Sequence, residues 1–455
     1  MKHLVAFLLL LIASSLTAQQ PTPMPTPVPT NAPPVTPVPT DTPTPPAPAP
    51  PAAMPVMSTG PSLKITGQVR ERTEVDSRSF SFGVTPDVVH LLRSRLAVSA
   101  TIDSTLGAHV EVQDARVFGQ TKSTLNIGAP AFDLRQAWLE IKQIAGAPLA
   151  LRVGRQAIGY ANERLIGRID WRNDGQSFDG AVATIGGGEA SVDLLGLALA
   201  RNANTPVYNR DVFLAGAWAQ WRGKESPVGV QGYFLFDDPR LDPTHRQNRF
   251  TTGLYSNGAV SGFDYELEGT YQFGDDVREG PSPRTVKIAA SMIGARVGYT
   301  LKELASLRIG VGYDRLSGTD PQDSLTYGAF HTLYGTNHKF YGFMDYLLNI
   351  PVHTKGMGLQ DMMVNLSIAP LKTVKVGADL HLFALAVDPA KLANAPAGAS
   401  STIGTELDLS VSYAPTKALN VTCNYAVFDG DPNRLVLNGP RRTTQWGFVM
   451  LTVGF

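Results

Sequence analysis

Residues 263–274 read FDYELEGTYQFG, a stretch in which apolar and polar side chains alternate. Phe263, Tyr265 and Leu267 share one side of an extended chain, whereas Asp264 and Glu266 share the other. A period of two is typical of a β-strand with one apolar and one strongly polar face. A soluble β-sandwich shows the same period, but here it recurs across residues 62–455 without an amphipathic helix of any length. The sequence therefore predicts an all-β chain.

The recurring pattern predicts eighteen strands, each close to the roughly 9–11 residues that a tilted strand needs to cross a bilayer. A count of sixteen stays open, because the stretches near Gly186 and Tyr255 are weak strand candidates. We expect strands to begin near Leu63, His90, Thr105, Phe132, Leu149, Ser177, Ala190, Asp211, Pro227, Arg249, Gly262, Val286, Ser306, Leu359, Thr373, Thr402, Ala418 and Arg441.

The connections between these strands alternate in length. Short turns, among them Asn257-Gly258, alternate with long polar stretches such as residues 240–248 and 275–284. Outer-membrane barrels have short turns in the periplasm and long loops outside. The predicted fold is therefore a single-chain, transmembrane, antiparallel β-barrel.

The carboxyl terminus carries the sharpest local signal. Val449, Leu451, Val453 and the terminal Phe455 form an apolar row in which each residue is two positions from the next. This row resembles the signal by which the barrel-assembly machinery recognises outer-membrane proteins. We therefore expect a protein integral to the bacterial outer membrane, with membrane lipid and this machinery among its partners.

The first 61 residues are expected to lie outside the barrel. Residues 1–18 combine a basic start, an apolar run from Leu4 to Ala13 and a small polar exit, which predicts a secretory signal peptide. A transmembrane anchor would need about 20 apolar residues. Residues 19–61 hold 17 of the 34 prolines and predict a disordered periplasmic spacer. The spacer is either a simple tether or a handle for a periplasmic or cell-wall partner.

The composition excludes several classes of function. The 39 Lys and Arg balance 39 Asp and Glu, so no basic excess favours nucleic acid as a partner. A single cysteine excludes a disulfide framework and a cysteine-based zinc site. No H-E-x-x-H or G-x-S-x-G motif occurs. We predict no cofactor, no metal and no enzymatic activity, although spacing alone leaves open a catalytic group assembled by folding.

Arginine dominates the basic side chains, with 26 Arg against 13 Lys. Strand alternation places a set of them in the lumen: Arg70, Arg72, Arg93, Arg95, Arg152, Arg296 and Arg308. A guanidinium group binds a carboxylate through two parallel hydrogen bonds and stays charged, so a ring of them would select anions in a pore. The alternative is that lumen carboxylates pair with these arginines and only brace the barrel, the candidates being Glu74, Glu111, Glu140, Glu266 and Glu268.

Two blocks of sequence point to a known family. The first comprises DAR at residues 114–116, DLRQAWLE at 133–140, LRVGRQ at 151–156, NERLIG at 162–167 and SFDG at 177–180. The second is LYGTNHKFYGFMDY at residues 333–346, followed by GLQD at 358–361. Together they resemble the alginate-export domain family, and the resemblance covers residues 62–455.

The resemblance implies an eighteen-stranded outer-membrane porin whose arginine-lined pore passes a polyuronate from the periplasm to the cell surface. By motif, it implies as candidate polymer contacts Arg116, Arg135, Arg152, Arg155 and Arg164. It implies Glu140 and Asp179 as the carboxylates that fix them. A polyuronate carries one carboxylate per sugar, which matches guanidinium groups spaced along a lumen. The proline-rich spacer is not part of the family pattern.

The block around His338 lies in a stretch of more than 40 residues between the strand candidates, from Leu316 to Gln360. Its aromatic content is too high for a solvated loop, so we expect it to fold into the lumen as a constriction or plug. The residues of this predicted constriction are Asn337, His338, Lys339, Tyr341 and Asp345. Packing on the barrel wall is the alternative, and residues 340–348 could instead form another strand.

Three functions remain open from the sequence. The first is an outer-membrane channel for an alginate-like anionic polysaccharide or a related anionic solute. The second is a general porin or a porin for solute uptake. The third is an envelope tether or adhesin that uses the barrel as its anchor.

Overall fold

The computed structural model describes residues 60–79, 86–118, 132–200, 212–242, 245–278, 283–437 and 443–455. The expected signal peptide at residues 1–18, and all but the last two residues of the expected spacer at 19–61, lie outside these ranges. Within them, twenty strands form one sheet, and eighteen of these strands are long.

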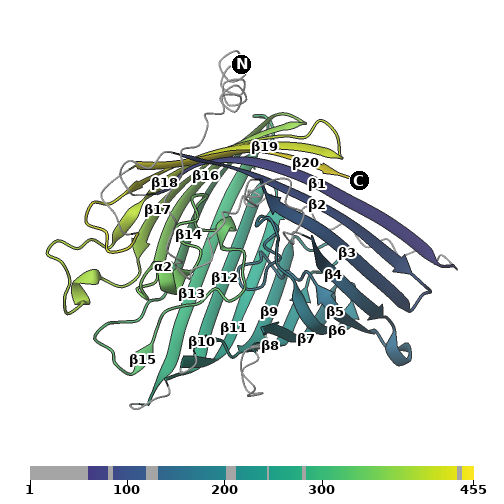
Figure 1. Cartoon of the computed structure of the whole chain (residues 1–455), viewed down its shortest axis with the longest axis horizontal. Coiled ribbons are helices and arrows are strands. Elements are labelled where there is room, and N and C mark those ends of the chain that lie inside the picture. The colour runs from purple at the N-terminus through teal and green to yellow at the C-terminus, as the bar shows by residue number, and fades with distance from the viewer. Residues whose placement is uncertain are drawn as a thin grey trace, which may run out of the picture. The chain divides into compact units, whose positions relative to one another are not determined.

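The long strands follow one another around the barrel wall (Figure 1). They are β1 (Ser62–Ser77), β2 (Asp87–Thr101), β3 (Leu106–Val117), β4 (Phe132–Ile141), β5 (Leu149–Gln156), β6 (Phe178–Gly187), β7 (Ala190–Ala200), β8 (Val212–Trp221), β9 (Val228–Asp237), β11 (His245–Val260), β12 (Phe263–Arg278), β13 (Arg284–Leu301), β14 (Leu307–Leu316), β16 (Leu359–Leu371), β17 (Val374–Leu385), β18 (Thr402–Tyr413), β19 (Leu419–Gly430) and β20 (Thr443–Gly454). The short elements are η2 (Ile144–Gly146), β10 (Arg240–Asp242), β15 (Thr326–Tyr327), η3 (Asn337–Lys339), α2 (Ile350–His353) and η4 (Pro389–Lys391).

Consecutive long strands pair antiparallel, and β1 pairs both with β2 and with β20, so the sheet closes on itself. Closure leaves no free strand edge, which a wall in hydrocarbon requires because lipid offers no hydrogen-bond partner. The predicted fold, an all-β antiparallel barrel of eighteen strands, is confirmed.

The strands begin within four residues of the predicted positions, but several boundaries differ. The predicted turn at Asn257-Gly258 is wrong, because β11 continues to Val260 and the chain reverses at Ser261 and Gly262. Both turn residues have a positive φ, 52° and 90°, which suits a two-residue hairpin. The polar stretches at 240–248 and 275–284 were expected to be loops, but they are partly strand. Strands β11, β12 and β13 continue into them beyond the apolar part of each strand. Residues 340–348 contain no strand.

The outward face of the wall carries aromatic rings near both ends of its strands. Phe234, Phe250 and Phe273 contact one another toward the loop end, and Phe263 contacts Tyr299 beside the short turns. Exposed aliphatic side chains occupy the band between these rings. An apolar band flanked by two aromatic girdles is typical of barrels that span an outer membrane.

The first and last strands meet in a seam that includes the terminal residue. Gly67 N donates to Phe455 O at 3.0 Å, and Phe455 N donates to Gly67 O at 3.1 Å. The Phe455 ring lies across the backbone of Gly67, where a Cβ atom would overlap it. The ring therefore covers a glycine of the neighbouring strand, an arrangement that helps to fix the register of a sheet.

Two long loops fold into the lumen. We call residues 157–177, between β5 and β6, the first inward loop, and residues 317–358, between β14 and β16, the second inward loop. They meet at a parallel β-bridge between Ile166 and Tyr334. Their apolar side chains pack with inward-facing residues of the wall in one buried cluster, so part of the lumen is filled by protein. Among the described residues, no helix is long and apolar enough to cross a membrane.

Replacing Gly67 by valine is expected to weaken the seam, because the new side chain would displace the Phe455 ring. Because the Phe455 ring is largely exposed and can move aside, the cost should lie at or below the low end of the about 1–3 kcal/mol that overpacking costs in a core. After refolding into detergent micelles, the fraction of compact, heat-modifiable barrel on a gel should fall. Gly269→Val is the matched control. Gly269 lies on the outward face of β12, as Gly67 lies on that of β1, but a Cβ at Gly269 would meet open space. Equal losses in the two variants would contradict the role of the seam contact.

Candidate functional site

Arginines of β1 and β2 hold the first inward loop by its backbone carbonyls. Arg70 and Arg93 both donate to Asp170 O, at 2.8 and 2.7 Å, and Arg70 and Arg72 both donate to Trp171 O at 3.1 Å. All three guanidinium groups are buried. A buried carbonyl left without a donor costs about 1–3 kcal/mol, so these bonds fix the path of the loop. The three arginines face the lumen, as alternation predicts, but the loop covers them.

Arg95 and Arg135 hold the same loop from the neighbouring part of the wall. The pairing of β3 with β4 skips Arg135, which is therefore the extra residue of a β-bulge that turns its side chain inward. Arg135 donates to Gln176 O and to Ser177 Oγ. Oδ1 of Asp170 accepts from Arg95 at 2.7 Å and from Arg135 at 3.2 Å. One carboxylate thus joins two wall arginines to the loop.

The surroundings of Asp170 keep it ionised. Burial alone would raise the pKa of its carboxyl group, but the guanidinium groups of Arg95, Arg135 and Arg93 lower that pKa below its ordinary value. Half of the Asp170 side chain is nevertheless exposed to solvent. Asp170 is therefore a charged group that is paired on one side and accessible on the other.

The first inward loop presents a row of charged side chains to solvent. Arg168, Asp170, Arg172 and Asp174 stand two residues apart in the stretch RIDWRND, and each is partly or largely exposed. The sign of the charge alternates along the row. Sequence reasoning missed this stretch, and its one readable signal was the regular spacing of opposite charges between two strand candidates.

Arg164 joins the two inward loops in a buried charge cluster. Its guanidinium lies 3.0 Å from Glu268 and 2.9 Å from Asp314, both on the wall, and donates to Tyr341 Oη at 2.8 Å. It also lies 3.9 Å from the ring centre of Phe340. Because the Arg164 side chain has no exposed surface, it braces the loops and does not reach a solute.

Two further arginines predicted for the pore are paired with carboxylates. Arg296 contacts Glu266 at 3.2 Å and Asp314 at 2.7 Å, and Arg308 contacts Asp264 at 2.6 Å. Both arginine side chains are largely buried. In this part of the wall, arginine and carboxylate brace one another, which is the alternative that the sequence left open.

Carboxylates of β18 hold the second inward loop by its backbone N–H groups. Phe343 N donates to Asp408 Oδ2 at 3.1 Å, and Met344 N donates to Glu406 Oε1 at 2.6 Å. Gly342 has a φ of 79°, and a Cβ on it would lie 2.5 Å from Glu406 Oε1, so the contact requires glycine. The second inward loop is therefore docked inside the barrel.

His338 and Asp345 of the predicted constriction lie where the loops pack together. His338 Nδ1 is 2.6 Å from Asp345 Oδ1, and the His338 ring stacks on Trp171 of the first inward loop at 5.4 Å. Burial lowers the pKa of His338 well below its ordinary value and raises the pKa of Asp345 well above its own. The pair therefore contributes packing and a buried hydrogen bond where the two loops meet.

Asn337 and Lys339 tie the same segment to its surroundings. Asn337 Nδ2 donates to Thr332 Oγ1 at 2.6 Å and to Leu348 O at 2.5 Å. Lys339 Nζ lies 3.3 Å from Glu163 of the first inward loop. These contacts hold the segment within the second inward loop and against the first.

Arg152 faces inward on β5 and keeps wide access to solvent. Its side chain is 41% exposed, Nη2 lies 2.7 Å from Glu140, and the guanidinium lies 4.4 Å from the ring centre of Trp138. Lys142 contacts the other oxygen of Glu140 at 3.3 Å. Two basic side chains thus share one carboxylate at the short-turn end of the lumen. Glu111, another carboxylate predicted as a partner, lies 3.7 Å from Arg95 of β2.

Arg116 and Arg155 lie on the outward face, contrary to the prediction from the family motifs. Arg155 pairs with Asp179 at 2.8 Å, and Arg116 pairs with Asp114 on the same strand. Arg155 is three positions from Arg152, and an odd separation within one strand places two side chains on opposite faces. Neither outward arginine can contact a solute inside the barrel.

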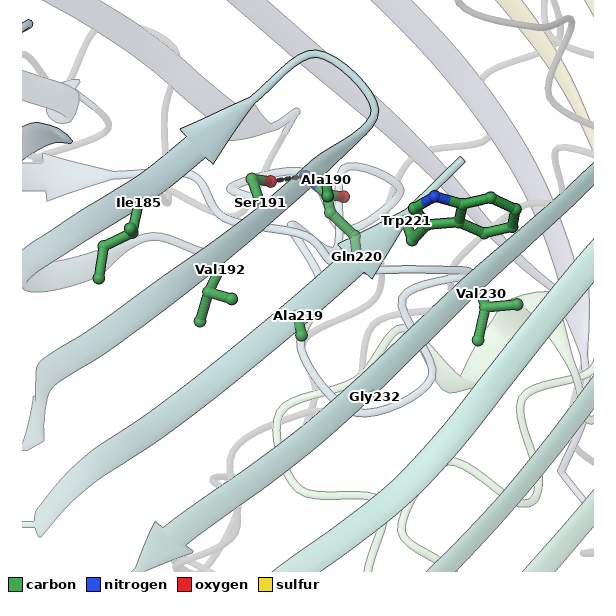
Figure 2. Close-up of a pocket in the computed structure, with 9 residues that line it drawn as sticks. All are labelled: Ile185, Ala190, Ser191, Val192, Ala219, Gln220, Trp221, Val230 and Gly232. Carbon is green, nitrogen blue, oxygen red and sulfur yellow. Dashed lines mark hydrogen bonds between the residues drawn. The ribbon is translucent and has the colours of Figure 1, made fainter. Parts of the chain in front are cut away.

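A shallow groove of about 360 Å³ crosses the outward face of β6 to β9 near the short turns (Figure 2). Ile185, Val192, Ala219, Trp221 and Val230 line it, and most of these side chains are apolar and exposed. The groove faces the lipid and is separate from the lumen. Within the described ranges, no three His, Cys, Asp or Glu side chains come together as metal ligands would.

A family model described as alginate export matches residues 62–432, which is most of the chain. The chain belongs to the alginate export family. This membership and the closed barrel identify an outer-membrane channel protein. A search among curated proteins gave no sequence match.

Solved structures with a similar fold include three outer-membrane-type barrels. OccK8 (OprE) of Pseudomonas aeruginosa has 12% identity and a TM-score of 0.53, with 87% of this chain and 98% of that chain covered. OccAB4 of Acinetobacter baumannii has 13% identity and a TM-score of 0.54, with 87% and 99% covered. The outer membrane protein OprD of P. aeruginosa has 10% identity and a TM-score of 0.55, with 88% and 96% covered. These likenesses concern the fold of this alginate export family member.

Arg93→Met is expected to loosen the first inward loop, because Asp170 O and Arg172 O lose a buried donor. Amide protons of residues 168–176 should exchange about ten- to a hundredfold faster, in line with about 1–3 kcal/mol for such a loss. Hydrogen-exchange mass spectrometry measures this. Arg308→Met removes a different buried ion pair from the wall and serves as control. If it accelerates exchange in residues 168–176 equally, the anchoring role of Arg93 is wrong.

Gly342→Ala and Gly356→Ala test the docking of the second inward loop. Both glycines lie in this loop with a similar positive φ, 79° and 76°, so both substitutions carry the same backbone cost of about 1–2 kcal/mol. At Gly342 the new Cβ would also strike Glu406, whereas at Gly356 it meets open space. The thermal midpoint of the Gly342→Ala barrel should therefore lie below that of Gly356→Ala. Equal midpoints would argue against the carboxylate contact as a docking point.

Proposed function

We propose that the barrel passes an anionic polysaccharide, or a solute with the same carboxylate chemistry, through its lumen. The observation that carries the proposal is the placement of accessible arginines inside the barrel. Arg152 on the wall and Arg168 and Arg172 on the first inward loop all expose a large part of their side chains. Guanidinium groups in a confined lumen favour anions and bind carboxylates in a planar geometry.

Buried positive charge behind the first inward loop supports the same conclusion. The described ion pairs of its five wall arginines involve three carboxylates, those of Glu74, Glu111 and Asp170. The hydrogen bonds of Arg70 and Arg93 end on carbonyl and amide oxygens, which carry no full charge. A low-dielectric wall focuses such fixed charge into the lumen and raises the local concentration of anions.

Membership of the alginate export family favours a polyuronate as the solute. A polyuronate carries one carboxylate on each sugar, so it presents regularly spaced anions to the arginines that it passes. Weak, repeated contacts of this kind allow a chain to enter and also to leave, which conduction requires.

Uptake of small anionic or neutral solutes is the second candidate. The observation that favours it is the packing of two loops inside the barrel, which fills part of the lumen with buried side chains. Anchoring of an envelope tether would depend on residues 19–61, most of which lie outside the described residues.

Single-channel recording in a planar bilayer tests the proposal. The refolded barrel should be anion-selective, and a polyuronate should block its current while a neutral glucan should not. Arg152→Ala should raise the polyuronate concentration for half block by about threefold to tenfold, the equivalent of one charge-assisted contact. A large, unselective conductance that no polymer blocks would favour the general porin.

Arg155→Ala is the matched control for Arg152→Ala. Both arginines belong to β5, both are paired with one carboxylate, and their exposed fractions are similar, 41% and 36%. They differ in the face of the wall that they occupy. Arg155→Ala should leave block unchanged, and a loss of block equal to that of Arg152→Ala would contradict a contact inside the lumen.

A further inference from the structure

The groove on the outward face of β6 to β9 lies near the periplasmic end of the wall (Figure 2). It ends beside the short turns, which outer-membrane barrels place in the periplasm. Small residues such as Ala219 and Gly232 leave it open between the larger side chains of Ile185 and Trp221, each of which is 46% exposed. An alkyl chain therefore makes more van der Waals contacts in this groove than on the convex wall beside it.

The lining of the groove suits an apolar occupant. Its two polar side chains besides the indole, Ser191 and Gln220, bond one another, because Gln220 Nε2 donates to Ser191 Oγ at 2.9 Å. The Trp221 ring lies beside the turn, since a Cβ on Gly223 would be 3.2 Å from it. Among the described residues, the Trp221 N–H has no acceptor. Tryptophan at this depth of a membrane protein meets lipid headgroups with its polar edge.

The two short turns beside the groove are joined and carry charges without counterions. Arg222 N donates to Glu189 O at 2.8 Å, and Lys224 N donates to Glu189 Oε1 at 3.0 Å. The side chains of Lys224, Glu189 and Glu225 are exposed, and within the described ranges none of them forms an ion pair. Arg222 is occupied elsewhere, because its Nη2 donates to Asn257 Oδ1 on the inward face of β11 at 2.6 Å. The end of the groove thus presents one ammonium group and two carboxylates.

These charges match a headgroup that carries both signs. A phospholipid phosphate is an anion that pairs with the ammonium group of Lys224. An ethanolamine group adds a primary ammonium with three N–H donors, for which Glu189 and Glu225 are acceptors. A choline group carries the same charge but has no N–H donor. An anionic headgroup such as that of phosphatidylglycerol meets more carboxylates than ammonium groups here, so repulsion disfavours it.

We propose that the groove and the two turns beside it bind one phosphatidylethanolamine molecule of the periplasmic leaflet. One acyl chain lies in the groove, and the phosphate contacts Lys224 and the Trp221 N–H. The ethanolamine ammonium contacts Glu189 and Glu225. This inference concerns the lipid-facing side of the wall and does not depend on what passes through the lumen.

Native mass spectrometry of the refolded full chain, released from detergent with one added lipid at a time, tests the site. Phosphatidylethanolamine should bind about fivefold more tightly than phosphatidylcholine with the same acyl chains, because two carboxylates accept from its primary ammonium. Phosphatidylglycerol should bind no more tightly than phosphatidylcholine. Equal affinities for the ethanolamine and choline lipids would overturn the proposal.

Ala219→Phe tests the groove, because the new ring would fill it. The affinity for phosphatidylethanolamine should fall about tenfold, the equivalent of lost contact with about two methylene groups. Ala295→Phe is the matched control, since Ala295 also lies on the outward face of the wall, on β13 between the exposed Ile293 and Val297. Equal losses in the two variants would show ordinary lipid contact in place of a site and would overturn the proposal.

Glu189→Gln combined with Glu225→Gln tests the headgroup contacts. Glutamine keeps the size of the side chain but carries no charge, so the preference for ethanolamine over choline should be lost while phosphatidylcholine binds as before. Glu303→Gln removes an exposed carboxylate from the short turn between β13 and β14 and is the matched control. A preference that survives the double substitution, or that Glu303→Gln abolishes equally, would overturn the proposal. Lys224→Gln should weaken both lipids about fivefold, and unchanged binding would contradict the phosphate contact.

Two other occupants of the site would give different results. Glycerophosphoethanolamine, the same headgroup without acyl chains, should not displace the lipid at equal concentration. Displacement would show a headgroup site that needs no membrane and would overturn the proposal. A dimer of the chain that Ala219→Phe abolishes, with lipid binding unchanged, would show that a second copy occupies the groove and would overturn it as well.

Discussion

Donation from buried arginines to the carbonyls of the first inward loop is the interaction on which the lumen depends. A loop that packs inside a barrel loses hydrogen bonds to water, so each carbonyl that it buries needs a donor from the protein. A guanidinium group supplies five N–H donors in a fixed plane, so Arg70 can bond two carbonyls and Asn173 at once. Arginine in this wall therefore acts first as a support for backbone and only secondarily as a contact for solutes.

The hydrogen bonds that hold the second inward loop run in the opposite direction, from the loop to the wall. Where the first loop offers carbonyls to guanidinium groups, the second offers N–H groups to the carboxylates of Glu406 and Asp408. Buried arginines lie on β1, β2 and β4, where Glu74 accompanies them, and buried carboxylates lie on β16 to β18. Arg164 connects the two loops, because it reaches from the first loop to wall carboxylates and to Tyr341 of the second.

The strands were predictable from the sequence because successive side chains of a strand point to opposite faces of the wall, which produces a period of two. Alternation alone places Arg155 on the outward face, since it stands three positions from Arg152, whereas the family motif implied a contact in the lumen. Arg135 was less accessible to prediction, because a β-bulge shifts the alternation by one residue and the bulge is visible only in the pairing. The partners of Arg70 and Arg93 could not be predicted at all. Both arginines bond the backbone carbonyl of Asp170, which lies 100 residues from Arg70 and 77 from Arg93, and any sequence supplies carbonyls.

The sequence separation of these contacts has a consequence for the order in which the barrel assembles. Contacts between neighbouring strands are local, the bond from Met344 to Glu406 spans 62 residues, that from Arg70 to Asp170 spans 100, and the seam contact between Trp446 and Glu74 spans 372. The entropic cost of closing a segment rises with its length, so closure of the seam carries the largest entropic cost of these contacts. Loop-closure entropy therefore favours docking of the inward loops before β1 pairs with β20, and closure of the sheet then encloses the loops.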